Sequence, residues 1–223
     1  MSGVAIVSGG MDSVTLAWHL KDANPNEDLY LVSFDYGQRH KKELEFAALC
    51  AHDVGAKAHH IVDLSAITPL ISNSALTGNI DVPEGHYADE SMALTVVPNR
   101  NAIMLAIATG FAVNVGAQYV AAGMHAGDHP IYPDCRPEFV NEMSLAMRAG
   151  NKGYCSEYFA IIAPFVNKMK QDIVSIGARL GVDYSKTWTC YKGLEFHCGV
   201  CGTCVERKEA FSIAGVVDPT YYA

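Results

Sequence analysis

The chain has 223 residues, of which 50% are apolar and 18% charged, so it can bury the core of one large domain. These values exclude a mainly disordered chain and a long multidomain assembly. The formal net charge of −8 provides no overall positive field for a polyphosphate backbone, so we expect no nucleic-acid partner.

Strand and helix patterns alternate in the first part of the chain. Short β-branched apolar runs predict buried strands at Val4–Val7, Leu29–Phe34 and Ala58–Val62. We expect a helix to begin at Asp12 or Ser13, and a charged amphipathic helix to run over 40–52. Residues 68–98 are rich in Ser, Asn, Gly, Pro and acids and lack periodicity, which predicts a long insertion or lid.

The alternation continues in the second part. Helices are expected at 101–115, 138–148 and 171–180, and strands at 119–122 and 159–162. This order predicts an α/β fold with a parallel sheet, helices on both faces, and ligands at the carboxyl ends of the strands.

One stretch, from Asn101 to Gly127, contains no Asp, Glu, Lys or Arg and is long enough to cross a bilayer. Its apolarity comes mostly from alanine, and it lacks aromatic or basic flanks at both ends. We therefore interpret it as a buried helix followed by a buried strand, with no membrane partner.

The loop Ser8-Gly9-Gly10-Met11-Asp12-Ser13 follows the first expected strand and opens the first helix. Two glycines allow positive φ and close approach to an anion, while free N–H groups and two hydroxyls share one concavity. The alternative is an ordinary glycine turn capped by serine. No Gly-Lys-Ser/Thr or Gly-x-Gly-x-x-Gly pattern occurs here, so the loop differs from Walker and dinucleotide-binding loops.

The motif S-G-G-x-D-S resembles the signature of the PP-loop ATP pyrophosphatases. That resemblance implies a Rossmann-like fold of the adenine nucleotide alpha hydrolase type. It also implies that ATP is a co-substrate and that Mg²⁺ acts through Asp12. The implied ATP contacts are Ser8, Gly9, Gly10, Met11, Asp12 and Ser13.

Four further segments narrow the family. They are Phe34-Asp35-Tyr36-Gly37-Gln38-Arg39-His40, Val97-Pro98-Asn99-Arg100-Asn101, Tyr132-Pro133-Asp134-Cys135-Arg136 and Thr187-Trp188-Thr189-Cys190-Tyr191. In this order they resemble the 7-cyano-7-deazaguanine synthase family of queuosine biosynthesis. The resemblance implies a ligase that joins ammonia to 7-carboxy-7-deazaguanine through adenylated carboxylate and amide intermediates, and it implies a cytoplasmic homodimer.

Several charged side chains fit that chemistry, although each has an alternative as a solvated surface charge. Three arginines in loops suit a carboxylate or phosphate, two aspartates suit a guanine-like edge, and Lys170 matches a family lysine that resembles a phosphate ligand. His40 is either a proton shuttle or a structural cap. The expected catalytic residues are Asp12, Ser13, Arg100 and Lys170, and the expected substrate-binding residues are Arg39, His40, Arg100, Asp128, Tyr132, Asp134 and Arg136.

Two positions depart from the family pattern. Asn99 stands where the family usually has glycine, and Pro130-Ile131 stand where it usually has Ser-Gly. Both changes stiffen or fill a loop expected to touch substrate. Alternative functions are a variant that stops at 7-amido-7-deazaguanine, another PP-loop amidating or tRNA-thiolating enzyme, and a catalytically silent nucleotide-binding module.

Four of the seven cysteines, Cys190, Cys198, Cys201 and Cys204, lie close together near the C-terminus. No signal peptide pattern precedes the first strand, so we expect reduced, cytosolic thiols and a metal site. Four thiolates suit structural Zn²⁺, and the shared C-x2-C-x2-C core leaves a [4Fe-4S] cluster open. We expect residues 1–185 to form the ATP-binding domain and 186–223 a small zinc-binding segment with a helix. Cys135 is expected to pack or to shape the substrate site.

Overall fold

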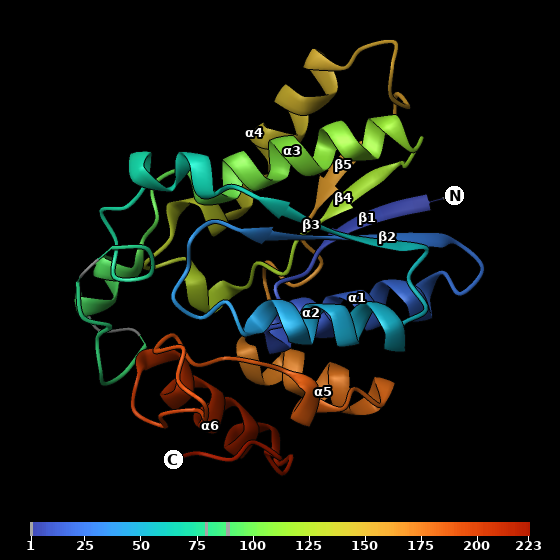
Figure 1. Cartoon of the computed structure of the whole chain (residues 1–223). Helices are drawn as coiled ribbons and strands as arrows, with labels where there is room; N and C mark the ends of the chain where they lie inside the picture. The colour runs from blue at the N-terminus through green and yellow to red at the C-terminus, as the bar shows by residue number, and fades with distance from the viewer. Residues whose placement is uncertain (1, 79, 88–89) are drawn as a thin grey trace.

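A five-stranded parallel sheet lies at the centre of the fold (Figure 1) in the computed structural model, which describes residues 2–78, 80–87 and 90–223. The strand order is β3-β2-β1-β4-β5, which confirms the predicted α/β class. All five strands lie where the apolar runs predicted them, with ends that differ by one or two residues. They are β1 Ser2–Ile6, β2 Asp28–Asp35, β3 Ala58–Asp63, β4 Tyr119–Ala121 and β5 Ala160–Ile162.

Helices cover both faces of this sheet (Figure 1). Helices α3 (Arg100–Asn114) and α4 (Pro137–Gly150) lie on one face. On the other lie α1, α2 and α5, with α6 packed against α5; these are Met11–Ala23, Glu43–Asp53, Lys170–Leu180 and Gly202–Ala214. Side chains alternate between the two faces of a strand, so neighbouring residues of β1 enter different cores, Val4 on the α3 side and Ala5 on the α1 side.

The second helix begins three residues later than its pattern predicted. The N–H groups of residues 43, 44 and 45 donate to the carbonyls of residues 40, 41 and 42, so the chain enters α2 through a tighter turn with i to i+3 bonds. This turn leaves His40 before the helix, at the carboxyl end of β2. No helix in the described part of the chain is long and apolar enough to cross a membrane; the uncharged stretch is α3 followed by β4.

The two central strands set the position of the site. β1 pairs with β2 on one side and with β4 on the other, so the connections that leave β1 and β4 diverge and open a crevice between them. Gly123, just after β4, packs against the loop that follows β1. A Cβ at this position would lie 3.3 Å from backbone atoms of Asp12 and Ser13.

The described residues of the predicted insertion, 68–78, 80–87 and 90–98, pack on the body of the protein; residues 79, 88 and 89 lie outside the described residues. It holds the second half of a short 3-10 helix, Ser65–Leu70, and all of another, Glu90–Thr95. Its buried side chains, including Leu76 and Met92, join the core beneath α3. Glu84 also forms an antiparallel bridge with Cys201, so the insertion contacts the C-terminal cysteine segment. Its role as a lid stays a prediction.

Candidate functional site

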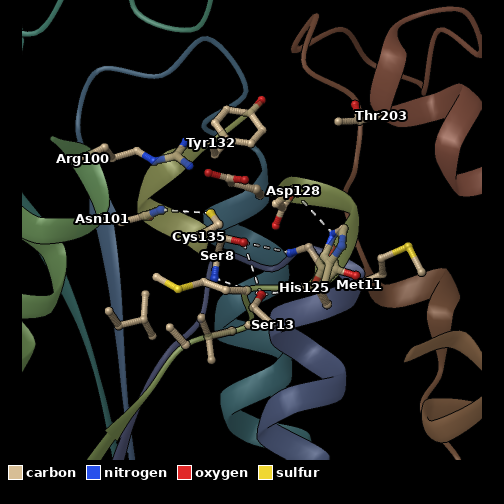
Figure 2. A pocket seen from close by; sticks show the side chains of 18 of the residues that line it. Ser8, Met11, Ser13, Arg100, Asn101, His125, Asp128, Tyr132, Cys135 and Thr203 are labelled. Carbon is tan, nitrogen blue, oxygen red and sulfur yellow. Dashed lines mark hydrogen bonds and ion pairs between the residues drawn. The ribbon is translucent and has the colours of Figure 1, made fainter. Parts of the chain in front are cut away.

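A pocket occupies the crevice at the carboxyl ends of β1, β2 and β4. Figure 2 shows Arg100 reaching from α3 toward Tyr132, with Ser8 and Ser13 on the opposite side. Thr203 enters from the C-terminal segment. Of the expected site residues, the pocket lining brings together Ser8, Gly10, Met11, Asp12, Ser13, His40, Arg100, Asp128, Tyr132 and Lys170.

The loop between β1 and α1 is folded around its two serines. The Ser8 N–H donates to Ser13 Oγ (3.1 Å), and the two hydroxyl oxygens lie 3.2 Å apart. Gly9 has a φ of +91°, and a Cβ there would lie 2.1 Å from the carbonyl oxygen of Glu43, so only glycine fits. α1 begins at Met11 without a side-chain cap, which leaves a helix N-terminus suited to an anion at the pocket.

One buried ammonium lies beside this loop. Lys170 Nζ is 3.3 Å from Asp12 Oδ2 and 2.5 Å from Glu206 Oε2. Burial alone would lower the pKa of Lys170, but the nearby carboxylates raise it above its ordinary value. Burial raises the pKa of Glu206, against the opposing charge of Lys170. The lysine therefore stays charged, and it bridges α6 and the loop of residues 8–13 between β1 and α1.

His125 lies on the other side of Asp12. The Gly127 N–H donates to His125 Nδ1 (3.1 Å), so in the neutral ring the proton is on Nε2. That nitrogen is 3.5 Å from Asp128 Oδ1 and 3.8 Å from Asp12 Oδ2. Tyr87 donates its hydroxyl to the same Asp128 oxygen (3.0 Å). These contacts connect the insertion, the loop after β4 and the loop of residues 8–13.

Arg100 enters a chamber lined by tyrosines. Its Nη1 is 3.5 Å from the Tyr36 hydroxyl, and Tyr132 and Tyr191 line the same space. Burial raises the pKa of Tyr36 to about 12, although Arg100 opposes the shift, so this hydroxyl stays neutral. Within the residues that the structure describes, no carboxylate forms an ion pair with Arg100. The guanidinium is thus a half-buried cation with no ion-pair partner among the residues that the structure describes.

Three expected substrate-binding residues do not line the pocket. Arg39 donates through Nη2 to the carbonyl of Gly78 (2.5 Å), and Arg136 donates through Nε to the carbonyl of His129 (2.9 Å). Asp134 accepts from a backbone N–H in the first turn of α3 (3.3 Å). These side chains form hydrogen bonds with backbone groups of nearby loops and of a helix end. The residue type and its place in a loop do not predict this orientation of the side chain.

The residues around Arg100 are held tightly. Asn99 precedes α3 with a φ of +58°, the left-handed conformation that glycine adopts freely. Replacing the family's glycine with asparagine is therefore compatible with the backbone here, since asparagine tolerates this region better than most residues. Asn101 donates through Nδ2 to Cys135 Sγ (3.3 Å). Burial raises the pKa of the Cys135 thiol well above its usual value, which favours packing over nucleophilic attack.

The four clustered cysteines converge in space. The sulfur atoms of Cys190, Cys198, Cys201 and Cys204 all lie within 4.8 Å of one another. Backbone N–H groups donate to two of these sulfurs, at 3.4 Å to Cys190 and 3.3 Å to Cys198. These four sulfur atoms fit one tetrahedral metal ion. Backbone N–H groups and the N-terminus of α6 offset the negative charge of the thiolates.

Sequence reasoning missed His125 and Glu43, which line the pocket, and Glu206, which contacts the pocket residue Lys170. His125 follows β4 closely, so the rule that ligands lie at the carboxyl ends of strands could have identified it. Glu206 has no comparable local signal, because its approach to Lys170 depends on how α6 packs. Glu43 reads as a surface acid on an amphipathic helix, yet it is buried and lines the pocket.

Comparison with known proteins places this geometry in a family. A family model described as queuosine biosynthesis protein QueC matches residues 2–215. A protein from Rhizobium etli named 7-cyano-7-deazaguanine synthase is 53% identical over 100% of this chain and 92% of its own length. One from Mesorhizobium japonicum, named 7-cyano-7-deazaguanine synthase 1, is 54% identical over 100% and 94%.

More distant solved structures share the fold. The U34-tRNA thiolase NcsA from Methanococcus maripaludis, with its [4Fe-4S] cluster, has a TM-score of 0.50 and 16% identity, over 96% of this chain and 64% of that one. The NH3-dependent NAD synthetase from Campylobacter jejuni has a TM-score of 0.50 and 17% identity, over 83% and 66%. At these identities the likeness extends to the Rossmann-like architecture alone.

Proposed function

The chain belongs to the queuosine biosynthesis protein QueC family, and we propose that it is an ATP-dependent ligase that converts 7-carboxy-7-deazaguanine and ammonia to 7-cyano-7-deazaguanine. A carboxylate is a poor electrophile until its oxygen is made a leaving group. Attack of that oxygen on the α-phosphate of ATP gives an adenylate and pyrophosphate. Ammonia then displaces AMP to give the amide, and a second ATP activates the amide oxygen so that loss of AMP leaves the nitrile.

The phosphate loop supports the use of ATP. We place the phosphates of ATP against Ser8, Gly9, Gly10, Met11, Asp12 and Ser13, where the uncapped start of α1 and Lys170 offer positive charge. Asp12 Oδ1 is buried and has no hydrogen-bond partner among the described residues. A free carboxylate oxygen beside a phosphate site fits Mg²⁺, which would offset phosphate charge there.

The chamber around Arg100 supports a carboxylate substrate. We place the substrate carboxylate against the Arg100 guanidinium, which suits it by charge and by its planar donors. Tyr132 and Asp128 line the same pocket and supply polar groups for the heterocycle. Positioning and electrostatic stabilisation between Arg100 and the phosphate loop would carry the rate, without a protein nucleophile.

The proposal also covers the domain organisation, the oligomeric state and the partners of the protein. Residues 1–185 form the ATP-binding domain with 68–98 as its lid, and 186–223 form a structural zinc segment. The enzyme works as a cytoplasmic homodimer on a small molecule and binds no nucleic acid. The net charge of −8 supports a free deazapurine substrate over a polynucleotide.

Elemental analysis of the purified protein is expected to find about one zinc per chain in a colourless solution, because four convergent thiolates form a closed tetrahedral site. Metal content and the visible absorption spectrum are measured on the same sample. A brown protein that contains iron would contradict the zinc assignment and indicate an iron–sulfur cluster.

A single observation carries the proposed function: the uncapped start of α1 and an arginine with no ion-pair partner among the described residues line one pocket. The test incubates the protein with 7-carboxy-7-deazaguanine, ATP and ammonia and analyses the products by mass spectrometry. We expect the nitrile together with AMP and pyrophosphate. The amide alone, heavier than the nitrile by one water, would identify a variant that stops halfway, and failure to form AMP would refute the ligase.

A further inference from the structure

Three buried polar side chains, Gln38, Glu43 and His40, form a connected series, and the last two line the pocket near Arg100. Gln38 is fixed by the backbone: its Nε2 donates to the carbonyl of Phe34 (3.0 Å), and its Oε1 accepts from the Tyr36 N–H (2.8 Å). The same Nε2 also donates to Glu43 Oε1 (3.1 Å). One carboxylate oxygen of Glu43 is therefore held by Gln38, and the other oxygen faces His40.

His40 ends this series at the pocket. Its Nε2 lies 3.5 Å from Glu43 Oε2, and its ring packs against Tyr191 with centroids 5.2 Å apart. Its other nitrogen, Nδ1, is buried and has no hydrogen-bond partner among the described residues. When Glu43 is ionised and Nε2 carries the ring proton, Nδ1 is a hydrogen-bond acceptor for which the described residues offer no donor.

The pKa values of His40 and Glu43 are shifted in opposite directions. Burial and the nearby charge of Arg100 lower the pKa of His40 to about 3. Burial raises the pKa of Glu43 to about 8, although Gln38 and Arg100 oppose the shift. A proton that reaches Nδ1 is therefore not retained by the ring, because Nε2 can pass its own proton to the carboxylate.

We propose that His40 and Glu43 form the proton acceptor for the ammonia that attacks the adenylate, an inference that rests on the proposed function. Nitrogen forms a bond to the acyl carbon, the bond from that carbon to the AMP oxygen breaks, and AMP leaves with the electron pair. The surplus proton of the attacking nitrogen moves to His40 Nδ1 while the Nε2 proton moves to Glu43. The products are the amide, AMP and a neutral Glu43 carboxyl.

Two half-reactions separate this role from substrate binding. Exchange of labelled pyrophosphate into ATP, with 7-carboxy-7-deazaguanine and without ammonia, reports adenylate formation alone. Amide formation after ammonia is added reports the attack. We expect His40→Asn and Glu43→Gln to keep exchange within about threefold of the wild-type rate and to slow amide formation about 100-fold or more, the usual range for loss of a general base.

The matched control is Glu45→Gln, an exposed position of α2 two residues from Glu43, which should leave both rates unchanged. Hydroxylamine provides a readout that a structural role would not move. Its nitrogen is less basic than ammonia and loses its proton more readily, so the two variants should recover hydroxamate formation to within a few-fold of wild type.

Loss of exchange in parallel with amide formation would overturn the proton-acceptor role in favour of a role in binding or folding. Unchanged amide formation in both variants, or failure of hydroxylamine to rescue them, would overturn it as well. A wild-type protein without any exchange would refute the proposed function itself, and with it this inference.

Discussion

Replacing Lys170 with methionine is expected to lower the rate of pyrophosphate release about a thousandfold, the upper range for loss of one charge-stabilising group at a reacting centre. Lys170 and Arg100 are the lysine and arginine of the described pocket lining, and Lys170 lies beside the phosphate loop through Asp12. Without it, developing charge on the phosphates would face carboxylates. Initial rates with saturating ATP and substrate measure the effect.

Lys168→Met is the matched control, since Lys168 is exposed two residues earlier in the chain. It should retain the wild-type rate. Circular dichroism and thermal unfolding would establish that Lys170→Met still folds, which matters because Glu206 loses its partner. A folded Lys170→Met protein with more than about a tenth of the wild-type rate would contradict the placement of ATP at this loop.

Much of the fold was predictable because its strands are short, apolar and separated by turn residues. Helix α6 was the element least predictable from the sequence. It has no clear apolar stripe to mark its bounds, and its buried Arg207 would be expected at the surface. The late start of α2 also followed from a local turn at residues 40–42 that helix propensity does not encode.

The site was predictable where its residues are adjacent in sequence. The phosphate loop is read from six consecutive residues, and its partner Lys170 from family resemblance. Glu206 and Tyr87 reach the same place from α6 and from the insertion, which only tertiary packing determines. Arg39 and Arg136 lie outside the pocket lining, because a cation in a loop after a strand can turn toward a backbone carbonyl as readily as toward a ligand, and their role in substrate binding stays a prediction.

Arg207 is the fully buried charge that connects the cysteine segment to the C-terminal tail. Its Nε and Nη2 donate to Asp218, and Nη1 donates to Thr187 Oγ1 (2.7 Å) and Thr189 Oγ1 (3.1 Å). Nη2 also donates to the carbonyl of Tyr184 (3.0 Å). The five guanidinium donors thus all have acceptors. A buried arginine with this set of partners is a structural residue whose removal leaves several polar groups unpaired.

Arg207→Met is therefore expected to lower the free energy of unfolding by about 3–5 kcal/mol, the range for breaking a buried ion pair from one side. Urea unfolding followed by circular dichroism measures the loss. Arg179→Met, at an exposed position of α5, is the control and should change the free energy by less than about 0.5 kcal/mol. A similar small change in Arg207→Met would show that the tail is held by other contacts.

The double variant Arg207→Met/Asp218→Asn should be less destabilised than the sum of the two single variants, because each single change leaves a charged partner unpaired.

Burial alone would raise the pKa of Asp218, but Arg207 and Tyr222 hold it below its ordinary value of 3.8. Stability from such a depressed carboxyl is present above pH 3.8 and is lost as the pH falls. The gap between wild type and Arg207→Met should therefore narrow below about pH 4, and a gap independent of pH would assign the loss to packing of the arginine rather than to its charge.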